Sequence, residues 1–419
     1  MVDAIEKIAN VAMERIEMEN ASNPLVKKLT TATEAFLRSH RMLGYGGTAI
    51  NNLLPKEDQF YNPKYDIPDY DFYSETPQLH AMDLADKISK IDGVENVEVR
   101  PAAHLGTFKV FANYIGVADI TQMDTNLFKT LWKTRVVKSG ISYVSANFLR
   151  MGVYLELARP KGDVERWPKV YARLLLLNKN YPIETGCSME KIREITPIQR
   201  ERIEKFLIQH KAMLLGFNAS SLQQGKNKWQ FPLDIMVDED KREATVKELN
   251  EFIDGKVVEN EAYGHILPPS SEIEKDGNVL VRVYQPAYCH SYHRMPNGLR
   301  IASIPTLLQF FFSMLHGDEH IREKVSEHRL ICVAQHLMEM AHGTSRRFKL
   351  LTPLECIGKV ESTIDVKKER SVLYAKLSKN KSSAAFIEKF FGYKPLESTR
   401  KQKNKLRSIL KKTIRNQLK

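Results

Sequence analysis

The sequence predicts a mixed α+β protein that contains two related units, each a mixed sheet flanked by helices. Between residues 44 and 125, segments with helical spacing of apolar residues alternate with segments that have strand spacing. The same order of patterns recurs between residues 209 and 315 at low identity. Alternating helix and strand patterns are typical of sheets covered by helices. A chance match of similar patterns is the alternative to a true repeat.

The elements follow one another in a regular order along the first half of the chain. Two helices fill the first 40 residues, and Asn23-Pro24 separates them because proline interrupts a helix. Helices are then expected at 48–54, 80–91, 144–160 and 164–182, and strands at 67–73, 94–101, 106–114 and 117–121. The expected domains are an N-terminal helical segment (1–40), a first unit (41–185), a second unit (186–345) and a basic helical region (346–419).

Composition places the chain among globular proteins without a membrane span. It has 419 residues, 42% of them hydrophobic and 27% charged, which is enough for two or three domains. The longest apolar run is too short to cross a bilayer, and the N-terminus lacks the pattern of a signal peptide. No paired spacing links the cysteines, which are Cys187, Cys289, Cys332 and Cys356. We therefore expect a reduced, cytoplasmic protein that does not enter a membrane.

The net charge of +12 favours a polyanionic partner, because binding to phosphates releases counterions. An acidic membrane surface and simple solubility are the alternatives. The last segment, 401–419, has Lys or Arg at eight positions and no acidic residue. Its apolar residues recur at helical spacing, which predicts an amphipathic basic helix. Such a helix can bind nucleic acid, or pack on the protein with a solvated cationic face.

Three aspartates form the first half of a candidate site. Asp69 and Asp71 project from the same side of the expected strand 67–73, because side chains alternate along a strand. Asp119 lies on a later strand. If the two strands are neighbours, three carboxylates converge and repel one another. Two Mg²⁺ or Mn²⁺ ions would resolve this repulsion, activate an attacking hydroxyl and stabilise a leaving pyrophosphate.

A glycine turn forms the second half. Gly46 and Gly47 lead into a helix at Thr48, so backbone N–H groups and the positive end of the helix face a phosphate. The Thr48 hydroxyl is a further donor. A glycine pair alone is usually a turn, and Asp-x-Asp alone is usually surface decoration. Their order and spacing together predict a nucleoside triphosphate held beside metal ions.

The stretches LGYGGTAIN, IPDYDFYS and VADIT resemble the three sequence marks of the polymerase-β-like nucleotidyltransferase superfamily. The run 148–183 resembles, more closely, the catalytic subunits of viral poly(A) polymerases of the giant-virus and poxvirus type. The resemblance implies a nucleotidyltransferase fold and template-independent addition of adenylates from ATP to an RNA 3′ end. It also implies that Asp69, Asp71 and Asp119 bind metal and that Gly46 and Gly47 hold the triphosphate. Thr48 replaces the usual small residue, often serine.

The second unit lacks these marks, which predicts that it is degenerate. In the sequence alignment Asn218-Ala219 stands opposite Gly46-Gly47, Leu-Asp-Ile stands opposite Asp-Tyr-Asp, and no acidic residue stands opposite Asp119. We expect this unit to be structural or to handle RNA, and to bind no catalytic metal.

The expected partners are ATP and an RNA 3′ end. Candidate RNA-binding residues are Arg150, Lys161, Arg166, Lys401, Lys403, Lys405, Arg407, Lys411 and Lys412. Giant-virus relatives imply a homodimer, poxvirus relatives imply a methyltransferase partner, and a viral protein would be found in the virion or viral factory. The rival functions are transfer of a nucleotide to another acceptor (a tRNA end, a small molecule or a protein) and non-catalytic RNA binding.

Overall fold

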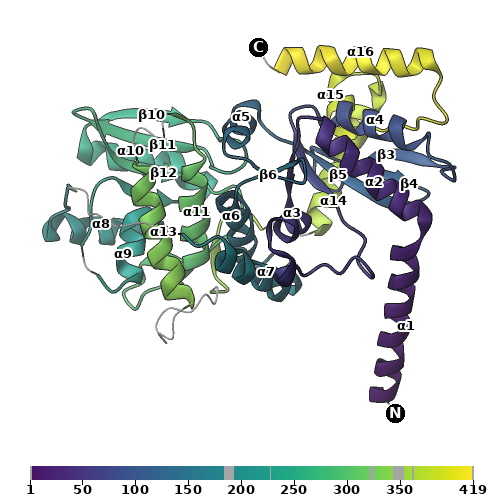
Figure 1. Ribbon diagram of the computed structural model, residues 1–419. Coiled ribbons are helices and arrows are strands. Elements are labelled where there is room, and N and C mark those ends of the chain that lie inside the picture. Colours follow the sequence, from purple (N-terminus) through teal and green to yellow (C-terminus); the bar gives the residue numbers. More distant parts are fainter. Residues whose placement is uncertain are drawn as a thin grey trace. The chain divides into compact units, whose positions relative to one another are not determined.

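The computed structural model describes residues 2–183, 193–226, 228–319, 321, 325–342, 353–360 and 363–417. It contains two mixed sheets, and each belongs to its own compact unit (Figure 1). Unit 1 combines Met1–Ser145 with Thr363–Lys419, and unit 2 is Ala146–Ser362. The predicted α+β class with two sheet-containing units is confirmed.

Unit 1 is built around a sheet with the strand order β3-β4-β5-β2-β1-β7-β6. Its strands are β1 (Leu43–Tyr45), β2 (Asp71–Ser74), β3 (Val97–Pro101), β4 (Thr107–Ala112), β5 (Ile115–Gln122), β6 (Val136–Lys138) and β7 (Ile141–Tyr143). Its N-terminal helices are α1 (Val2–Ser22), α2 (Pro24–Ser39), α3 (Gly46–Leu53), α4 (Pro77–Ile88) and α5 (Thr125–Lys133). The break between α1 and α2 lies at Asn23, as predicted, where the side chain accepts a hydrogen bond from the Leu25 N–H.

Alternation along the strands separates a covered face from a polar face. Phe72, Phe108 and Ile120 are completely buried, and α4 contacts β3, β4 and β5. The neighbouring residues Asp71 and Asp119 point to the other face and are only half-buried. The apolar core therefore lies between α4 and one face of the sheet, and the candidate site lies on the opposite face.

β2 is shorter than predicted. It begins at Asp71 instead of residue 67, so Asp69 precedes the strand. Pro68 cannot donate a ladder hydrogen bond, and the partner strand β1 ends at Tyr45, opposite Asp71. One further hydrogen bond, from the Asp119 N–H to the Tyr70 carbonyl (2.9 Å), joins β5 to the residue just before β2.

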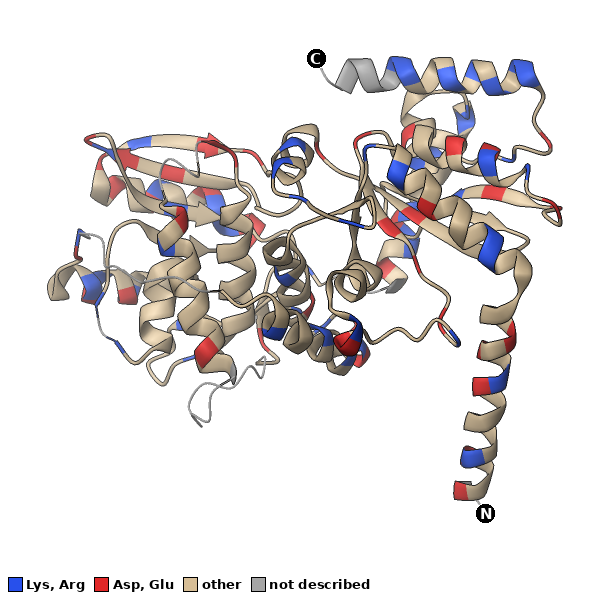
Figure 2. Cartoon of the chain, in the orientation of Figure 1, with Lys and Arg blue, Asp and Glu red and all other residues tan. Residues whose placement is uncertain are grey.

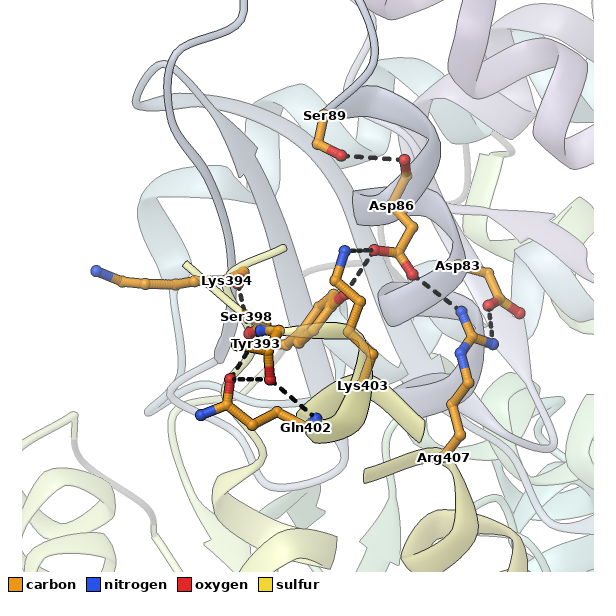
Figure 3. A network of polar contacts seen from close by, with 10 residues as sticks. Asp83, Asp86, Ser89, Tyr393, Lys394, Ser398, Gln402, Lys403 and Arg407 are labelled. Carbon is orange, nitrogen blue, oxygen red and sulfur yellow. Dashed lines mark hydrogen bonds and ion pairs between the residues drawn. The ribbon is translucent and has the colours of Figure 1, made fainter. Parts of the chain in front are cut away.

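The C-terminal region folds onto unit 1 through α14 (Thr363–Leu377), α15 (Ala384–Phe390) and α16 (Arg400–Gln417). Tyr393 adds a bridge to the edge strand β3 through two backbone hydrogen bonds with Val99 (2.8 and 3.1 Å). Lys403 and Arg407 of α16 bind acidic side chains of α4 (Figure 3). The C-terminal segment is therefore part of unit 1 and does not form a separate region at 346–419.

Unit 2 has the strand order β10-β11-β12-β9-β8-β14-β13-β15. Its strands are β8 (Met213–Leu214), β9 (Leu233–Met236), β10 (Lys256–Asn260), β11 (Ser270–Lys275), β12 (Asn278–Tyr284), β13 (His290–Arg294), β14 (Arg300–Ala302) and β15 (Cys356–Ile357). Its described helices are α6 (Ala146–Leu157), α7 (Trp167–Asn180), α8 (Pro197–Gln209), α9 (Gly216–Gln223), α10 (Arg242–Ile253), α11 (Ile304–Leu315) and α13 (Glu327–His342).

The first seven strands of unit 2 repeat the sheet of unit 1 position by position, and β15 is an addition at one edge. A short helix follows the equivalent strand in both units, α3 after β1 and α9 after β8. The predicted repeat is confirmed as a repeat of topology. The boundary differs from the predicted first unit, 41–185, because α6 packs against α7 and α11 within unit 2.

The prediction of unpaired cysteines is wrong for Cys289 and Cys356, which form a disulfide with Cα atoms 5.3 Å apart. Antiparallel pairing of β13 with β15 places Ser291 opposite Cys356 and brings the two sulfurs together. The separation of 67 residues gave no recognisable spacing in the sequence. Among the described helices, none has the length and apolar character needed to cross a membrane.

Candidate functional site

Gly46 begins α3 with a φ of +74°, a conformation that side chains disfavour. A Cβ atom at this position would lie 2.6 Å from Oδ2 of Asp71, so a substituent would collide with the carboxylate. The missing side chain thus lets Asp71 approach the first turn of α3. Tyr45, the residue before the helix, makes no side-chain capping hydrogen bond. A carboxylate and a helix N-terminus therefore meet at one place.

Thr48 connects the same turn to the other aspartate of the Asp-x-Asp pair. Its buried hydroxyl donates a 2.5 Å hydrogen bond to the main-chain carbonyl of Asp69. The sequence predicts that this hydroxyl is a donor to a phosphate. In the structure it holds the segment that carries Asp69 against α3, which compensates for the early end of β2.

Asp71 and Asp119 lie directly opposite each other on the parallel strands β2 and β5. The side chain of Asp69 is exposed just before β2, and its charge is near enough to act on Asp119. Within the described ranges, no group of three His, Cys, Asp or Glu side chains is assembled closely enough to hold a metal ion. The structure thus brings two of the three predicted carboxylates together and leaves the third at their side.

The carboxylates share a partly dehydrated environment. Burial raises the pKa of Asp119, the hydrogen-bonded ammonium of Lys109 lowers it, and the Asp69 carboxylate raises it, so that it remains above its ordinary 3.8. Burial and the nearby Asp71 carboxylate also raise the pKa of the Tyr45 hydroxyl. Three carboxylates (Asp69, Asp71 and Asp119) against the one ammonium of Lys109 leave the site with an excess of negative charge, which a cation would stabilise.

Lys109 is a residue of this site that the sequence interpretation missed. It stands opposite Asp119 on the antiparallel strand β4, and its ammonium pairs with the Asp119 carboxylate. The bulge between Val110 and Phe111 shifts the register of β4 on β5, so the pairing could not be counted from the turn. The available signal in the sequence was that Lys109 alternates with the apolar residues Phe108 and Val110, which places its side chain on the polar face of the strand.

Two aromatic rings and a chain of hydrogen-bonded hydroxyl groups lie next to the carboxylates. The rings of Tyr45 and Tyr73 stack with centroids 3.8 Å apart. The Tyr45 hydroxyl bonds to Thr121 and Thr121 bonds to Thr107, each over 2.9 Å. These contacts hold the floor of the site in one arrangement beside Asp71 and Asp119.

The residues present fit a hard divalent cation. Asp71 and Asp119 supply carboxylate oxygens, the ligands that Mg²⁺ and Mn²⁺ prefer, and the exposed carboxylate of Asp69 beside them is a candidate third ligand. The ammonium of Lys109 already pairs with the Asp119 carboxylate, in the way that a metal ion would. The donor set and its excess negative charge therefore agree with the metal implied by the sequence resemblance.

The equivalent place in unit 2 has a built-in cation. Gly216 (φ +63°) begins α9 and faces Asp234 just as Gly46 faces Asp71. Arg282 stands opposite Asp234 on β12, where unit 1 has Asp119. Its guanidinium binds Asp234 (3.3 Å) and Glu272 (2.8 Å), and all three side chains are at most 6% exposed.

This geometry corrects the sequence alignment of the two units. The partner of Gly46 is Gly216, and Asn218 stands where unit 1 has Thr48. Position 119 corresponds to Arg282 instead of the segment near Cys289, because β12 and not the following turn is equivalent to β5. An arginine in place of the third aspartate agrees with the predicted degeneracy.

Among the candidate RNA-binding residues of unit 2, Arg150 is placed in the core. It is 1% exposed and donates hydrogen bonds to Asn147 (2.6 Å) and Asn178 (2.8 Å), so it cannot reach RNA. Burial lowers its pKa to about 10. Arg166 is exposed and pairs with Glu156 (3.0 Å), and Lys161 is exposed.

The candidates on α16 divide between two faces. Lys403 and Arg407 turn inward, where Asp86 accepts hydrogen bonds from Lys403 (2.9 Å) and Arg407 (3.0 Å) and Arg407 also pairs with Asp83 (Figure 3). The other four, Lys401, Lys405, Lys411 and Lys412, are exposed. Basic residues recur along the part of this helix that is not grey in Figure 2.

Comparisons with known proteins support the family and the fold. Residues 31–163 match the family model of the poly(A) polymerase catalytic subunit. A putative poly(A) polymerase catalytic subunit of Acanthamoeba polyphaga mimivirus is 30% identical over 203 residues, which cover 47% of this chain and 33% of the relative. The corresponding protein of African swine fever virus (isolate Pig/Kenya/KEN-50/1950) is 28% identical over 154 residues, which cover 35% of this chain and 32% of the relative. The aligned part thus spans about a third of each relative's length.

The crystal structure of the Megavirus polyadenylate synthase has the same fold, with a TM-score of 0.80 over 98% of this chain and 89% of that chain, at 20% identity. The matched segment 31–163 contains the glycine turn, the three aspartates and Lys109. The predicted resemblance is therefore confirmed: the part of the chain that holds the candidate site matches the poly(A) polymerase catalytic subunit family.

Proposed function

We propose that this chain is a poly(A) polymerase, which transfers AMP from ATP to the 3′ hydroxyl of RNA without a template. The observation that carries the proposal is the Asp71–Asp119 pair beside the Gly46 turn, within the segment that matches the poly(A) polymerase catalytic subunit family. The exposed lysines of α16 and the net charge of +12 support RNA as the acceptor.

In this proposal, Asp69, Asp71 and Asp119 hold two Mg²⁺ or Mn²⁺ ions. When bound, the ions lower the pKa of the attacking hydroxyl and neutralise the charge of the leaving pyrophosphate. The first turn of α3, from Gly46 through Gly47 to the backbone of Thr48, binds the triphosphate through N–H groups and the helix dipole. The Thr48 hydroxyl keeps Asp69 close to this turn.

The role of the protein in this reaction is positioning and electrostatic stabilisation, as in other phosphoryl transfers. The stacked Tyr45 and Tyr73 and the bonded Thr121 hold the strand ends that carry Asp71 and Asp119. A carboxylate pair fixed in this way does not need to reorganise during the reaction. The homodimer and the viral-factory location implied by the resemblance, and the cytoplasmic location inferred from the cysteine spacing, stay predictions that light scattering and imaging can check.

The test is a primer-extension assay with a short RNA, each of the four nucleoside triphosphates in turn, and Mg²⁺ or Mn²⁺. We expect a ladder of adenylates with ATP and none with the Asp71→Ala chain. A chain that binds the RNA but extends it with no nucleotide would be a non-catalytic RNA-binding protein. Extension by a single nucleotide only on a tRNA end, or labelling of a protein or small molecule, would assign a different acceptor.

A further inference from the structure

Lys109 forms the one ion pair recorded for Asp119 among the described residues. The two residues face each other on β4 and β5, and Asp119 faces Asp71 on β2. A row of three strands thus presents an ammonium, a carboxylate and a second carboxylate on one face of the sheet. The Lys109 side chain is 42% exposed while its ammonium contacts Asp119.

Unit 2 has the same row with the charges redistributed. Glu272, Arg282 and Asp234 occupy the positions of Lys109, Asp119 and Asp71. There the cation is central, contacts both carboxylates and is only 6% exposed. A buried guanidinium with two carboxylate partners cannot be exchanged without a large cost. Each unit therefore offsets part of the negative charge of its row with a basic side chain, but only the cation of unit 1 is exposed enough to leave.

We propose that Lys109 is an exchangeable counter-ion that pairs with Asp119 until divalent metal binds and then binds a phosphate of the RNA acceptor. This inference rests on the proposed function, since it assigns a role to Lys109 within the same site. The ammonium and the metal compete for the charge of one carboxylate, so each weakens the binding of the other. Once Asp119 is bound to metal, the released ammonium has three donors beside the place where the acceptor must lie.

The acceptor is the partner that fits this lysine. The Gly46 turn, which the proposed function assigns to the triphosphate, contacts the Asp71 side of the row. Lys109 lies on the opposite side, beyond Asp119. A cation on that side can attract a nucleic-acid backbone without blocking the first turn of α3. The exchange would also couple metal binding to acceptor binding.

The first test measures metal binding by calorimetry with Mn²⁺ in the absence of nucleotide and RNA. We expect Lys109→Met to bind Mn²⁺ about 2- to 5-fold more tightly than the unchanged chain, because an exposed ion pair that competes with the metal is removed. Lys109→Arg keeps the charge and should restore the original affinity. The matched control is Lys90→Met, an exposed lysine just after α4. Equal or weaker Mn²⁺ binding by Lys109→Met would overturn the exchange.

The second test measures RNA affinity against salt, with EDTA or with Ca²⁺ in place of the catalytic ion. With Ca²⁺, the slope of log affinity against log salt should fall by about 0.7 in Lys109→Met, the value for one lost phosphate contact to a single strand. With EDTA the slopes of the two chains should agree. An equal loss in both conditions would show a permanent contact and overturn the exchange.

The failure of this inference can be separated from the failure of the proposed function. If the unchanged chain extends RNA with ATP and Asp119→Asn removes Mn²⁺ binding, the proposed function stands whatever Lys109→Met does. If the unchanged chain neither binds Mn²⁺ nor extends RNA, both are overturned. Thermal unfolding of each variant checks that the exposed substitutions have left the fold unchanged.

Discussion

Gly46 shows how one missing side chain sets the geometry of the candidate site. Its φ of +74° and the 2.6 Å contact that a Cβ would make with Asp71 both exclude a larger residue. Both motifs, Gly46-Gly47 and Asp69-x-Asp71, could be recognised in the sequence because each is a local pattern. The contact between Gly46 and Asp71 could not, because it depends on the register of β1 on β2.

Gly46→Ala is therefore expected to destabilise the protein by about 1–3 kcal/mol through strain at a positive φ and a displaced carboxylate. Gly47 lies inside α3 without a positive φ, so Gly47→Ala should leave the free energy of unfolding almost unchanged or raise it. Thermal unfolding of the two variants makes the comparison. Equal melting temperatures would mean that the first turn of α3 tolerates a side chain.

The Asp71–Asp119 pair carries the second prediction at this scale. Asp71→Asn and Asp119→Asn keep the size of each side chain but remove the charge that would hold a metal, so adenylate addition should fall at least about 100-fold. Asp92→Ala, at an exposed aspartate after α4, is the control. Initial rates of primer extension decide the matter, and a near-normal rate in either Asn variant would remove that residue from the mechanism.

At the scale of elements, α16 combines two functions that its sequence does not separate. Helical spacing predicted its amphipathic character, and Leu410 is indeed buried. Which cations dock and which stay in solvent depends on the partner helix α4, whose Asp86 lies 317 residues before Lys403. Its acidic residues Asp83 and Asp86 could not be matched to α16 beforehand. The sequence therefore leaves both roles open for all six candidate cations of this helix, while the structure leaves four lysines available to RNA.

Replacing the exposed residues with glutamine (Lys401, Lys405, Lys411 and Lys412) should weaken RNA binding and lower the salt slope by up to about 3, without changing the melting temperature. Replacing the docked pair, Lys403 and Arg407, should lower the free energy of unfolding by about 1 kcal/mol and change the salt slope less. Filter binding and thermal unfolding of the two variants separate the faces. A reversed pattern would show that the assignment of faces is wrong.

The docked face of α16 also predicts a pH dependence. Burial raises the pKa of Asp86, but hydrogen bonds from Tyr393, Lys403 and Arg407 outweigh it and keep the pKa below its ordinary 3.8. A carboxyl whose pKa is lower in the folded state contributes stability above its unfolded pKa and loses it as pH falls through the folded value. Asp86→Asn should therefore lower the melting temperature at pH 7, and the difference should shrink below about pH 4. A difference that is constant from pH 7 to pH 3 would contradict this account.

At the scale of the whole molecule, the sequence supported the fold class and the repeat better than the boundaries. Periodicity is local, so the order of helices and strands could be predicted. The division into units depends on long-range packing: α6 joins unit 2 through α11, and the C-terminal segment returns to unit 1 through Tyr393 and α16. Strand β1, which pairs with β2 and β7, and the disulfide Cys289–Cys356 escaped prediction for the same reason, because their partners are distant in sequence. Strands β6 and β7 pair with each other across residues 139–140, but with three residues each they are too short to show a period.

The repeat leads to the prediction that metal binds only in unit 1. Both units have a glycine turn facing an aspartate, but Arg282 replaces the second carboxylate and binds Asp234 and Glu272 in the buried row of unit 2. A guanidinium held by two buried carboxylates leaves neither the charge nor the space for a divalent ion. Anomalous scattering from crystals soaked in Mn²⁺ and a non-hydrolysable ATP analogue should therefore show metal beside Asp71 and Asp119 alone.

Variants of the row Glu272–Arg282–Asp234 test the same prediction in solution. Arg282→Met should destabilise the protein by about 3–5 kcal/mol, because it leaves two buried carboxylates without a counter-ion. Glu272→Lys combined with Arg282→Asp copies the Lys109–Asp119–Asp71 row of unit 1 and should recover part of that stability while creating weak Mn²⁺ binding. The control is Asp234→Asn, which should not change the Mn²⁺ stoichiometry of the otherwise unchanged chain. Loss of a bound Mn²⁺ in Asp234→Asn would show that unit 2 holds a metal ion and that Arg282 does not replace that ion.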